Sequence, residues 1–377
     1  DGAGNAPALV IEQGGKIMAE GTENSPITFT ALNPEEVSTE TAQTDTDSEG
    51  LTMLETRGKW GGLIINGKAP ITGGTDTVEG LTNVPYGGTD PADNSGVLKC
   101  VSSYLLSPNC TSVHPCGAPS HRATPTHRYV RVWHGGAKIA DDNEINGVTF
   151  GGVGSGTVVD HCEVAFNKDD GFEFFGGTVN VKYLSVLFVG DDSFDTDEGY
   201  QGKGQFLFTM LGEQGNHGTE MDSKYENLPR SHPQFYGMTI VGSGSSGRQS
   251  AGMRLREGTG GKFGNVVMAN LGGVHSGVEN KQCTTGGAST SLVSTQDLSS
   301  VDASDLNSHL FFSSNNIIHE ASTDFVYESP CTNLGWTAVT SDPMLMVGAG
   351  TESDDAPIDP RPACGSPAYS DVDSVPD

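Results

Sequence analysis

The sequence predicts an all-β protein, built as a single right-handed parallel β-helix with long loop insertions. Three observations favour that fold class. Helical periodicity is almost absent, and short apolar runs recur every ~8–12 residues between Gly, Asp, Asn and Ser, which is typical of short strands. Glycine is frequent, with 52 of 377 residues, yet it follows no collagen-like Gly-X-Y period. A short motif also repeats through the middle of the chain.

The expected strands are the apolar runs themselves. Clear examples are residues 9–11, 27–30, 62–65, 129–133 and 206–208. We expect the aromatic residues of the central region to form stacks in the core rather than an exposed platform. These residues are Phe172, Phe174, Phe175, Phe188, Phe206 and Phe208.

The repeat consists of two series of segments that align with one another. The first series is centred on residues 149, 173, 195, 220, 254 and 279, and the second comprises 162–166, 184–188, 206–210, 238–241 and 266–270. The steps of the first series are 22–25 residues, except for one of 34 that requires a loop insertion near residues 226–233. Two or three strands in ~22 residues fit one coil of a β-helix, whereas a propeller blade needs ~40–45 residues. A propeller or a pair of sandwiches therefore fits less well, and Gly is expected at coil corners that need φ > 0 or close stacking.

We treat residues 1–377 as one β-helix domain that irregular segments interrupt. A Cys-containing loop insert is expected at 89–128, a Ser/Thr-rich loop at 281–308 and an irregular acidic tail at 351–377. Large loops on a rigid scaffold are places where function tends to reside.

The charge balance excludes several classes of partner. The formal net charge is −28, from 20 Lys and Arg against 48 Asp and Glu. Nucleic acids and anionic membranes would be repelled by such a surface, so we expect no nucleic-acid partner. No run of about 18 apolar residues is present, so no membrane span is expected.

The seven cysteines indicate an oxidising compartment. No CxxC or haem motif is present, and the spacing lacks a second pair for zinc. We expect three disulfide bridges among Cys100, Cys110, Cys116, Cys283, Cys331 and Cys364, with the pairing open. Cys162 lies in an apolar run and is expected to be a free, buried thiol. The sequence thus predicts a secreted protein, at the cell surface or outside the cell, whose signal peptide has been removed.

Several longer motifs resemble a family of secreted bacterial β-helix proteins of unknown function. Its members are often described as lipoproteins or cell-surface proteins, many of them from Bacteroidetes and marine Proteobacteria. The matching segments are 60–70 (WGGLIINGKAP), 93–96, 143–147 with 151–157, 169–178 (DDGFEFFGGT), 256–261, and 359–362 with 365–368. The resemblance covers roughly residues 8–370 and implies the β-helix fold, but no activity. The segment between Lys99 and Arg128 departs from the family pattern.

Acidic clusters at the coil corners suggest a calcium site. They are Asp141, Asp142, Asn143 and Glu144; Asp169 and Asp170; and Asp191, Asp192, Asp195, Asp197 and Glu198. The step between clusters is close to one coil, so carboxylates of adjacent coils would lie ~5 Å apart and repel one another. Ca²⁺ would relieve that repulsion, since it takes six to eight oxygen ligands. The alternative is an ordinary solvated acidic edge.

A second pattern suggests an enzyme. Asp170, Asp191, Asp192, His217 and Arg254 recur on successive coils, in an order that resembles polygalacturonase-type β-helix hydrolases. Those enzymes use carboxylates as acid and base on a sugar. The match is partial, and the coil length alone would align corner residues in this way.

The ladder of Glu173, Asp195, Glu220, Arg254 and Glu279 is expected to face outward, with Arg254 as the ion-pair partner of its acidic neighbours. From these features we favour a non-enzymatic role: an extracellular structural or adhesive protein, stabilised by calcium and self-assembling into a surface layer or filament. Exposed β-helix edges and the odd cysteine count support assembly. Two alternatives stay open. One is a polysaccharide-active enzyme, either a calcium-dependent lyase or a hydrolase, and the other is a carbohydrate-binding protein without catalysis.

Overall fold

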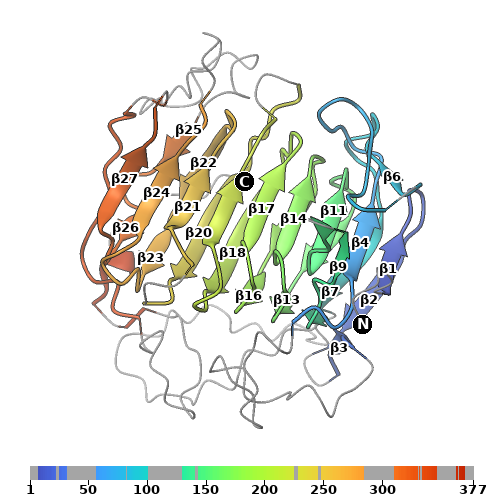
Figure 1. Ribbon diagram of the computed structural model, residues 1–377, viewed down its shortest axis with the longest axis horizontal. Helices are drawn as coiled ribbons and strands as arrows, with labels where there is room; N and C mark the ends of the chain where they lie inside the picture. Colours follow the sequence, from blue (N-terminus) through green and yellow to red (C-terminus); the bar gives the residue numbers. More distant parts are fainter. Residues whose placement is uncertain are drawn as a thin grey trace, which may run out of the picture.

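The structure is a computed structural model (Figure 1). It describes residues 7–22, 25–31, 57–81, 83–100, 130–140, 143–224, 228–244, 248–283, 310–329, 331, 333–345, 362–363 and 365–369. Almost every element in this part of the chain is a strand, and the exception is a short 3-10 helix, η4 (Pro367–Tyr369). No helix among these residues has the length and apolar character needed to cross a membrane.

One face of the molecule is a nine-stranded sheet, in which every neighbouring pair of strands is parallel. We call it the long sheet. Its strands, in spatial order, are β1 (Ala8–Ile11), β4 (Gly62–Asn66), β11 (Val148–Gly151), β14 (Phe172–Phe175), β17 (Phe194–Asp197), β19 (His217–Met221), β21 (Ala251–Leu255), β24 (Ser276–Asn280) and β27 (Thr323–Tyr327). The spatial order follows the chain order because each coil adds one strand.

The other two faces belong to a single 14-stranded sheet. One face holds β2 (Ile17–Gly21), β7 (Gly96–Cys100), β12 (Val158–Asp160), β15 (Asn180–Lys182), β22 (Gly261–Gly264) and β25 (Leu310–Phe312). The other holds β3 (Ile27–Phe29), β8 (Val130–Trp133), β13 (Cys162–Ala165), β16 (Ser185–Leu187), β23 (Val267–Ala269) and β26 (Ile317–Ile318). Two long strands, β18 (Lys203–Met210) and β20 (Gln234–Val241), run through both faces and join them.

Two small antiparallel pairs lie outside these sheets. They are β5 (Asp76–Thr77) with β6 (Pro85–Tyr86), and β9 (Lys138–Ala140) with β10 (Asn143–Glu144). Three strand positions per coil, stacked in parallel, make the fold a parallel β-helix, as the sequence predicted.

The repeat predicted from the sequence coincides with the pairing register of the long sheet. Thr149 pairs with Glu173, which pairs with Asp195, and the ladder continues through Glu220 and Arg254 to Glu279. The step of 34 residues reflects a long connection, residues 222–233, between β19 and β20, where the insertion was predicted.

A single residue in the left-handed region turns the chain at the corner between the second and third faces. The residues at this corner with φ between 54° and 69° are His161, Tyr183, Phe206, Gly237 and Asn265. The predicted second series is therefore one residue out of register at 206–210, because Phe206 is a corner residue and Thr209 pairs with Val186. Phe206 is also 47% exposed, so the expectation that it is a core residue was wrong.

A row of small residues lets the long sheet approach the third face closely. A Cβ atom on Gly147 would lie 2.4 Å from the Val164 side chain, and one on Gly171 would lie 2.7 Å from that of Val186. Their φ angles are not in the left-handed region. These glycines therefore provide the space for close stacking that was predicted, whereas the predicted positive φ occurs at other glycines, such as Gly176.

The core contains stacked aromatic rings from successive coils. The ring of Phe172 stacks between those of Phe150 and Phe194, with centroids 6.5 and 5.9 Å away, and Phe174 lies 5.1 Å from Phe150. Of the other aromatic residues expected there, Phe188 and Phe208 are buried and Phe175 is half-buried. Offset stacking of this kind adds to burial of apolar surface.

The structure corrects the predicted start of the Cys-containing insert. The Cys-containing insert was predicted to begin at residue 89, but residues 96–100 form β7, a strand between β2 and β12, and Leu98 is 1% exposed. Residues 96–99 alternate between the two sides of the strand, with Leu98 directed into the core, so this short segment is a strand rather than part of the loop. The remainder of that insert, from residue 101 to 128, lies outside the described residues, as do most of the predicted loop at 281–308 and of the predicted tail.

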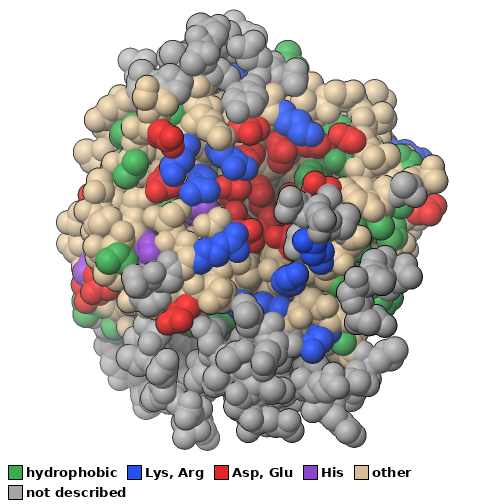
Figure 2. Space-filling model, viewed as in Figure 1, with side chains coloured by type: hydrophobic (Ala, Val, Ile, Leu, Met, Phe, Trp, Pro, Cys, Tyr) green, Lys and Arg blue, Asp and Glu red, His purple; other side chains and the backbone are tan. Residues whose placement is uncertain are grey.

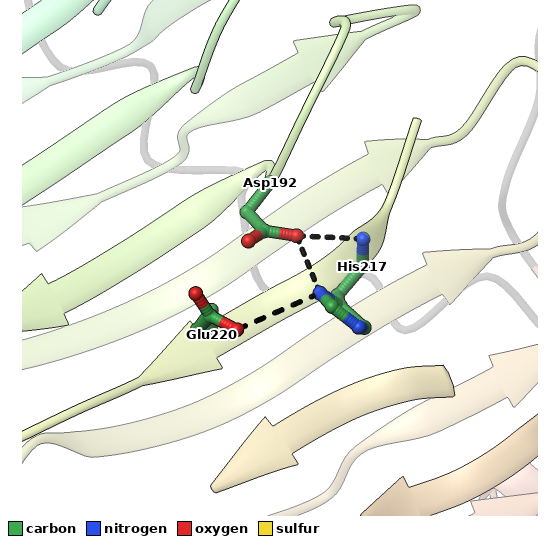
Figure 3. Close-up of side chains that lie close together, drawn as sticks. All are labelled: Asp192, His217 and Glu220. Atoms are coloured by element: carbon green, nitrogen blue, oxygen red, sulfur yellow. Dashed lines mark hydrogen bonds and ion pairs between the residues drawn. The ribbon is translucent and has the colours of Figure 1, made fainter. Parts of the chain in front are cut away.

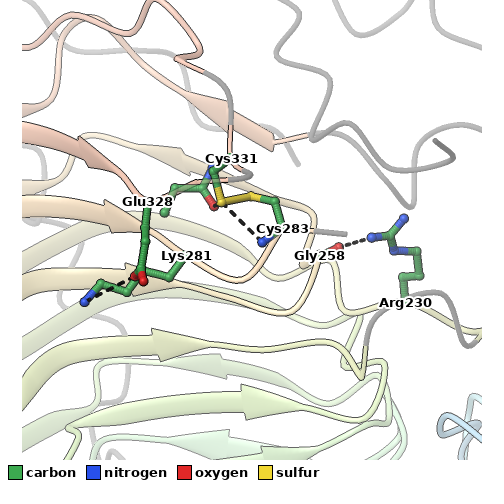
Figure 4. Close-up of a disulfide and its surroundings, with 7 residues drawn as sticks. Arg230, Gly258, Lys281, Cys283, Glu328 and Cys331 are labelled. Carbon is green, nitrogen blue, oxygen red and sulfur yellow. Dashed lines mark hydrogen bonds and ion pairs between the residues drawn. A yellow bond between two sulfur atoms is a disulfide. The ribbon is translucent and has the colours of Figure 1, made fainter. Parts of the chain in front are cut away.

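Cys283 and Cys331 form a disulfide that closes a 48-residue separation (Figure 4). Cys162 is buried and forms no disulfide, as predicted. The other cysteine side chains lie outside the described residues, so the remaining pairing stays a prediction.

Replacing Phe172 by Ala should lower the free energy of unfolding by ~3–5 kcal/mol, because it leaves a cavity in the aromatic stack. The matched control is Phe206→Ala, which removes a ring of the same size from an exposed corner and should cost less than ~1.5 kcal/mol. Chemical denaturation followed by circular dichroism measures both. Equal losses for the two variants would contradict this account of the core.

Candidate functional site

The outward side of the long sheet carries charged side chains in rows that run across the strands. The central row is the ladder predicted from the sequence, Glu173, Asp195, Glu220, Arg254 and Glu279. Because successive coils stack in register, side chains of one row lie within contact distance of one another. The parallel register thus converts a sequence repeat into a charged surface.

Two further rows flank the ladder. One precedes the ladder by three residues and includes Asp170, Asp192 and His217, and the other follows the ladder by two residues and includes Asp197, Asp222 and Arg256. We call the acidic part of these rows the acidic patch. It comprises Asp169, Asp170, Glu173, Asp191, Asp192, Asp195, Asp197, Glu220 and Asp222. Figure 2 shows acidic side chains gathered in the middle of this face of the molecule, with Lys and Arg side chains around them.

Carboxylate oxygens converge at two points of the acidic patch. Atoms of Asp170, Glu173 and Asp195 lie within 4.8 Å of one another, and so do atoms of Asp169, Asp170 and Asp191. Asp170 belongs to both groups. Asp195 is 9% exposed, and its Oδ1 is buried without a hydrogen-bond partner in the described part of the chain. Such an arrangement is costly unless a proton or a cation compensates it.

The unfavourable burial of these carboxylates raises their pKa values. Burial, followed by the charges of Asp169 and Asp192, holds the pKa of Asp170 well above its usual range. Burial and then Asp170 and Glu173 do the same for the pKa of Asp195. The pKa of Glu173 is also raised, by burial and then by Asp169 and Asp197. Among the described residues, no ion pair reaches Asp170, Glu173 or Asp195.

Basic side chains compensate the other half of the patch. Arg254 lies 3.2 Å from Glu220 and 3.3 Å from Glu279, as the ladder predicted. Arg256 donates to both oxygens of Asp222 and lies 3.0 Å from Glu220.

Although burial lowers it, the pKa of Arg256 is raised by these acidic partners, so its charge is permanent. Burial raises the pKa of Asp222 to about 6, against the hydrogen bond from Arg256. Arg248 lies 3.0 Å from Asp191 at the margin. The patch therefore divides into an uncompensated half over β14 and β17 and a compensated half over β19, β21 and β24.

His217 occupies the boundary between these halves (Figure 3). Its Nδ1 lies 2.7 Å from Oδ1 of Asp192 and 4.0 Å from Oε1 of Glu220. Burial, followed by the charge of Arg254, lowers the pKa of His217 to about 3, so the ring is neutral. Burial and Asp191 raise the pKa of Asp192 to about 8, opposed by the backbone N–H of His217. The 2.7 Å separation of Nδ1 and Oδ1 is that of a hydrogen bond, so the side chains of Asp192 and His217 are hydrogen-bonded to each other.

The structure places the residues of the predicted sites unevenly. It brings together Asp169, Asp170, Asp191, Asp192 and Asp195. The predicted metal ligands Asp141 and Asp142 lie outside the described residues, and so do the side chains of Asn143 and Glu144, whose backbone forms β10.

Two predicted ligands lie at the edge of the patch. Asp197 accepts a hydrogen bond from the Glu198 backbone N–H, and burial raises its pKa to about 6. Glu198 accepts a hydrogen bond from the Tyr86 hydroxyl at 2.8 Å and forms an ion pair with Lys224. Glu198 is thus occupied by protein partners rather than directed into the carboxylate groups.

The residues predicted for catalysis also lie on adjacent coils. Asp170 accepts the backbone N–H of Asp192, Asp192 bonds His217, and Arg254 lies beside Glu220 of the His217 strand. Sequence reasoning missed Asp222, Arg256 and Ser250. The first two follow ladder residues by two positions and so share their outward face, a signal that strand alternation could have revealed.

The comparisons with known proteins agree with this architecture. Residues 2–103 and 117–338 match a family model described as a pectate-lyase-like β-helix domain. The chain belongs to this family. No curated protein and no solved structure matches the chain. This match supports the β-helix fold that the resemblance to secreted bacterial proteins implied. The bacterial source and the secretion of this protein stay predictions.

In a chelator, the melting temperature should fall as the pH rises from ~5 to ~9, because the raised pKa values of the acidic patch favour the protonated native state. The folded protein binds more protons than the unfolded chain between the ordinary carboxyl pKa and the folded values of about 6 for Asp197 and Asp222 and about 8 for Asp192. The stability from those protons is complete at low pH and is lost as the pH rises through the folded values.

Differential scanning fluorimetry over this pH range measures the effect. The variant Asp195→Asn should weaken the dependence, whereas Glu12→Gln, which changes an exposed carboxylate on the first coil, should not. A melting temperature that rises with pH in the chelator would contradict the prediction.

Proposed function

We propose that the protein is a carbohydrate-active β-helix protein that binds an acidic polysaccharide over the acidic patch, with a divalent cation as the bridge. The observation that supports this proposal most directly is the group Asp170, Glu173 and Asp195. These three side chains place buried or half-buried carboxylates within 4.8 Å of one another without an ion-pair partner in the described chain. The pectate-lyase-like family assignment adds the ligand class, since pectate is an acidic polysaccharide.

Calcium fits the donor set of this group. All the converging atoms are carboxylate oxygens, which hard cations prefer, and the buried Oδ1 of Asp195 is the kind of acceptor that a cation would satisfy. Asp170, Glu173 and Asp195 would hold the ion, with Asp169 and Asp191 beside them. A bound cation would supply positive charge that neutralises a sugar carboxylate at the patch.

The chain itself provides the second half of a site for an anionic polymer. Arg254 lies on β21 and Arg256 directly after it, two strands away from β17 of the uncompensated half, and their side chains are 17% and 30% exposed. Arginine recognises planar carboxylates with paired donors. A polymer that lies across the strands would therefore meet the cation site first and the two arginines two or three coils further on.

The structural or adhesive role that the sequence favoured stays a prediction. A purely structural solenoid gains nothing from buried, mutually repelling carboxylates, because they cost stability. A ligand site accounts for that cost. The Cys283–Cys331 disulfide supports the proposed extracellular location, since such bridges persist in oxidising compartments.

Affinity electrophoresis in polygalacturonate gels, with calcium or with a chelator, tests the proposal. The wild-type protein should be retarded in calcium and released by the chelator. The double variant Glu173→Gln and Asp195→Asn should weaken calcium binding by at least about tenfold and abolish the retardation. Glu12→Gln is the control, and a neutral polymer such as dextran should retard none of these proteins.

Product analysis then separates the remaining alternatives. Unsaturated chain ends indicate a lyase, new reducing ends without unsaturation indicate a hydrolase, and an intact polymer indicates binding alone. Failure of calcium to promote binding to polygalacturonate or another polyuronate would refute the proposal. Calcium-driven sedimentation of the protein without polymer would favour the structural role.

A further inference from the structure

A hydrogen-bonded chain of three side chains crosses the boundary of the acidic patch. Oδ1 of Asp192 lies 2.7 Å from Nδ1 of His217, and Nε2 of His217 lies 2.7 Å from Oγ of Ser250. The three residues come from successive coils, two residues before β17, at the start of β19 and directly before β21. Carboxylate, imidazole and hydroxyl in this order form the arrangement of a catalytic triad.

The contacts are compatible with the tautomer that this order requires. Oδ1 of Asp192 accepts the backbone N–H of His217 at 2.7 Å, and the same oxygen faces Nδ1. An oxygen that already accepts one N–H is well placed to accept a second from Nδ1, which leaves the lone pair of Nε2 directed at Ser250. The ring is 0% exposed, so it has no freedom to rotate away.

A positive charge lies beside the hydroxyl. Nη2 of Arg254 donates to Oγ of Ser250 at 2.9 Å, while Glu220 and Glu279 hold the guanidinium on two other sides. The Nε of Arg254 is buried and has no hydrogen-bond partner in the described part of the chain. Donors fixed next to a nucleophile are suited to stabilise an oxyanion that develops there.

Only the hydroxyl end of the chain is open to a ligand. The side chains of Asp192 and His217 are 4% and 0% exposed, whereas Ser250 is half-buried. A ligand therefore reaches Ser250 directly and the imidazole only through it. An accessible hydroxyl with a buried imidazole behind it is expected of a nucleophile and its general base. A hydrogen-bond network with a purely structural role does not need an accessible hydroxyl.

We propose that Ser250 is the nucleophile of an ester hydrolase, with His217 as its general base and Asp192 as the residue that positions His217. The substrate class is an O-acyl ester of a carbohydrate, such as an acetyl group on a sugar hydroxyl. The choice of a polysaccharide as carrier of that ester rests on the proposed function, but the acyl-transfer chemistry does not.

The reaction balances without any further reactant than water. Oγ of Ser250 attacks the ester carbonyl carbon, and its proton passes to Nε2 of His217. The tetrahedral oxyanion collapses, the bond to the sugar oxygen breaks, and His217 returns the proton to that oxygen. Water then attacks the acyl-serine through the same base, which releases the carboxylic acid and restores Ser250.

Two measurements on the full chain test the nucleophile. Wild-type protein should hydrolyse p-nitrophenyl acetate and should be labelled by a fluorophosphonate at Ser250, as peptide mass spectrometry can locate. Ser250→Ala should abolish labelling and lower turnover by ~10³-fold or more. Ser322→Ala, an exposed serine near the last coils, is the matched control and should change neither.

The positioning role of Asp192 has a separate readout. Asp192→Asn should lower kcat by ~10²–10⁴-fold, because the amide favours the wrong tautomer of His217, and should leave KM unchanged. Circular dichroism checks that each variant is folded. Absence of labelling at Ser250 in folded wild-type protein, or unchanged turnover in Ser250→Ala, overturns the proposal.

The outcome is independent of the polymer proposal. Hydrolysis of the small ester should persist in a chelator, whereas retention by polygalacturonate should not. Loss of calcium-dependent binding with intact ester hydrolysis therefore refutes the proposed function alone, and the reverse result refutes the esterase alone.

Discussion

The in-register stacking of parallel coils is the constraint on which the rest of this structure depends. Each residue of one coil pairs with the equivalent residue of the next, and neighbouring strands lie ~4.8 Å apart. Whatever side chain a coil carries outward is therefore placed against its equivalents. Apolar repeats become aromatic stacks in the core, exemplified by Phe150, Phe172 and Phe194. Acidic repeats become the acidic patch.

The same register explains why the charges of the patch are distributed unevenly. Arg254 and Arg256 enter the rows only at β21, so they neutralise Glu220, Asp222 and Glu279 but do not reach back to the coils of β14 and β17. Asp195 stays buried beside two other carboxylates. An uncompensated acidic half and an arginine-compensated half thus lie side by side, which is the arrangement that the proposed cation-bridged polymer would need.

The close packing behind the long sheet gives this surface its rigidity. Glycines around the starts of its strands, such as Gly171 before β14 and Gly218 within β19, bring the sheet within contact of Val186 and Ile240 on the third face. The backbone at the start of each strand is therefore fixed, and with it the N–H of His217 that holds Asp192. The scaffold therefore positions Asp192 and His217, and Ser250 contacts His217 from the position directly before β21.

The sequence by itself determined the β-helix fold and the length of one coil. The spacing of 22–25 residues, the loss of helical periodicity and the central residues from Thr149 to Glu279 identify the fold and the register, because stacking demands one equivalent residue per coil. It also revealed that Asp170 and Asp192 would be neighbours. Strand alternation further explains why Glu173, Asp195 and Glu220 face outward.

Only the tertiary structure decided which of these side chains meet. Burial of Asp195, the pairing of Glu198 with Tyr86 and Lys224, and the exposed position of Phe206 depend on how corners and loops fold over the faces. Ser250 reaches His217 across a step of 33 residues that contains loops of irregular length. A repeat fixes position along a coil, but the direction of a side chain at a corner depends on local φ and on its neighbours. The carboxylate groups and the serine–histidine–aspartate chain therefore become visible only in three dimensions.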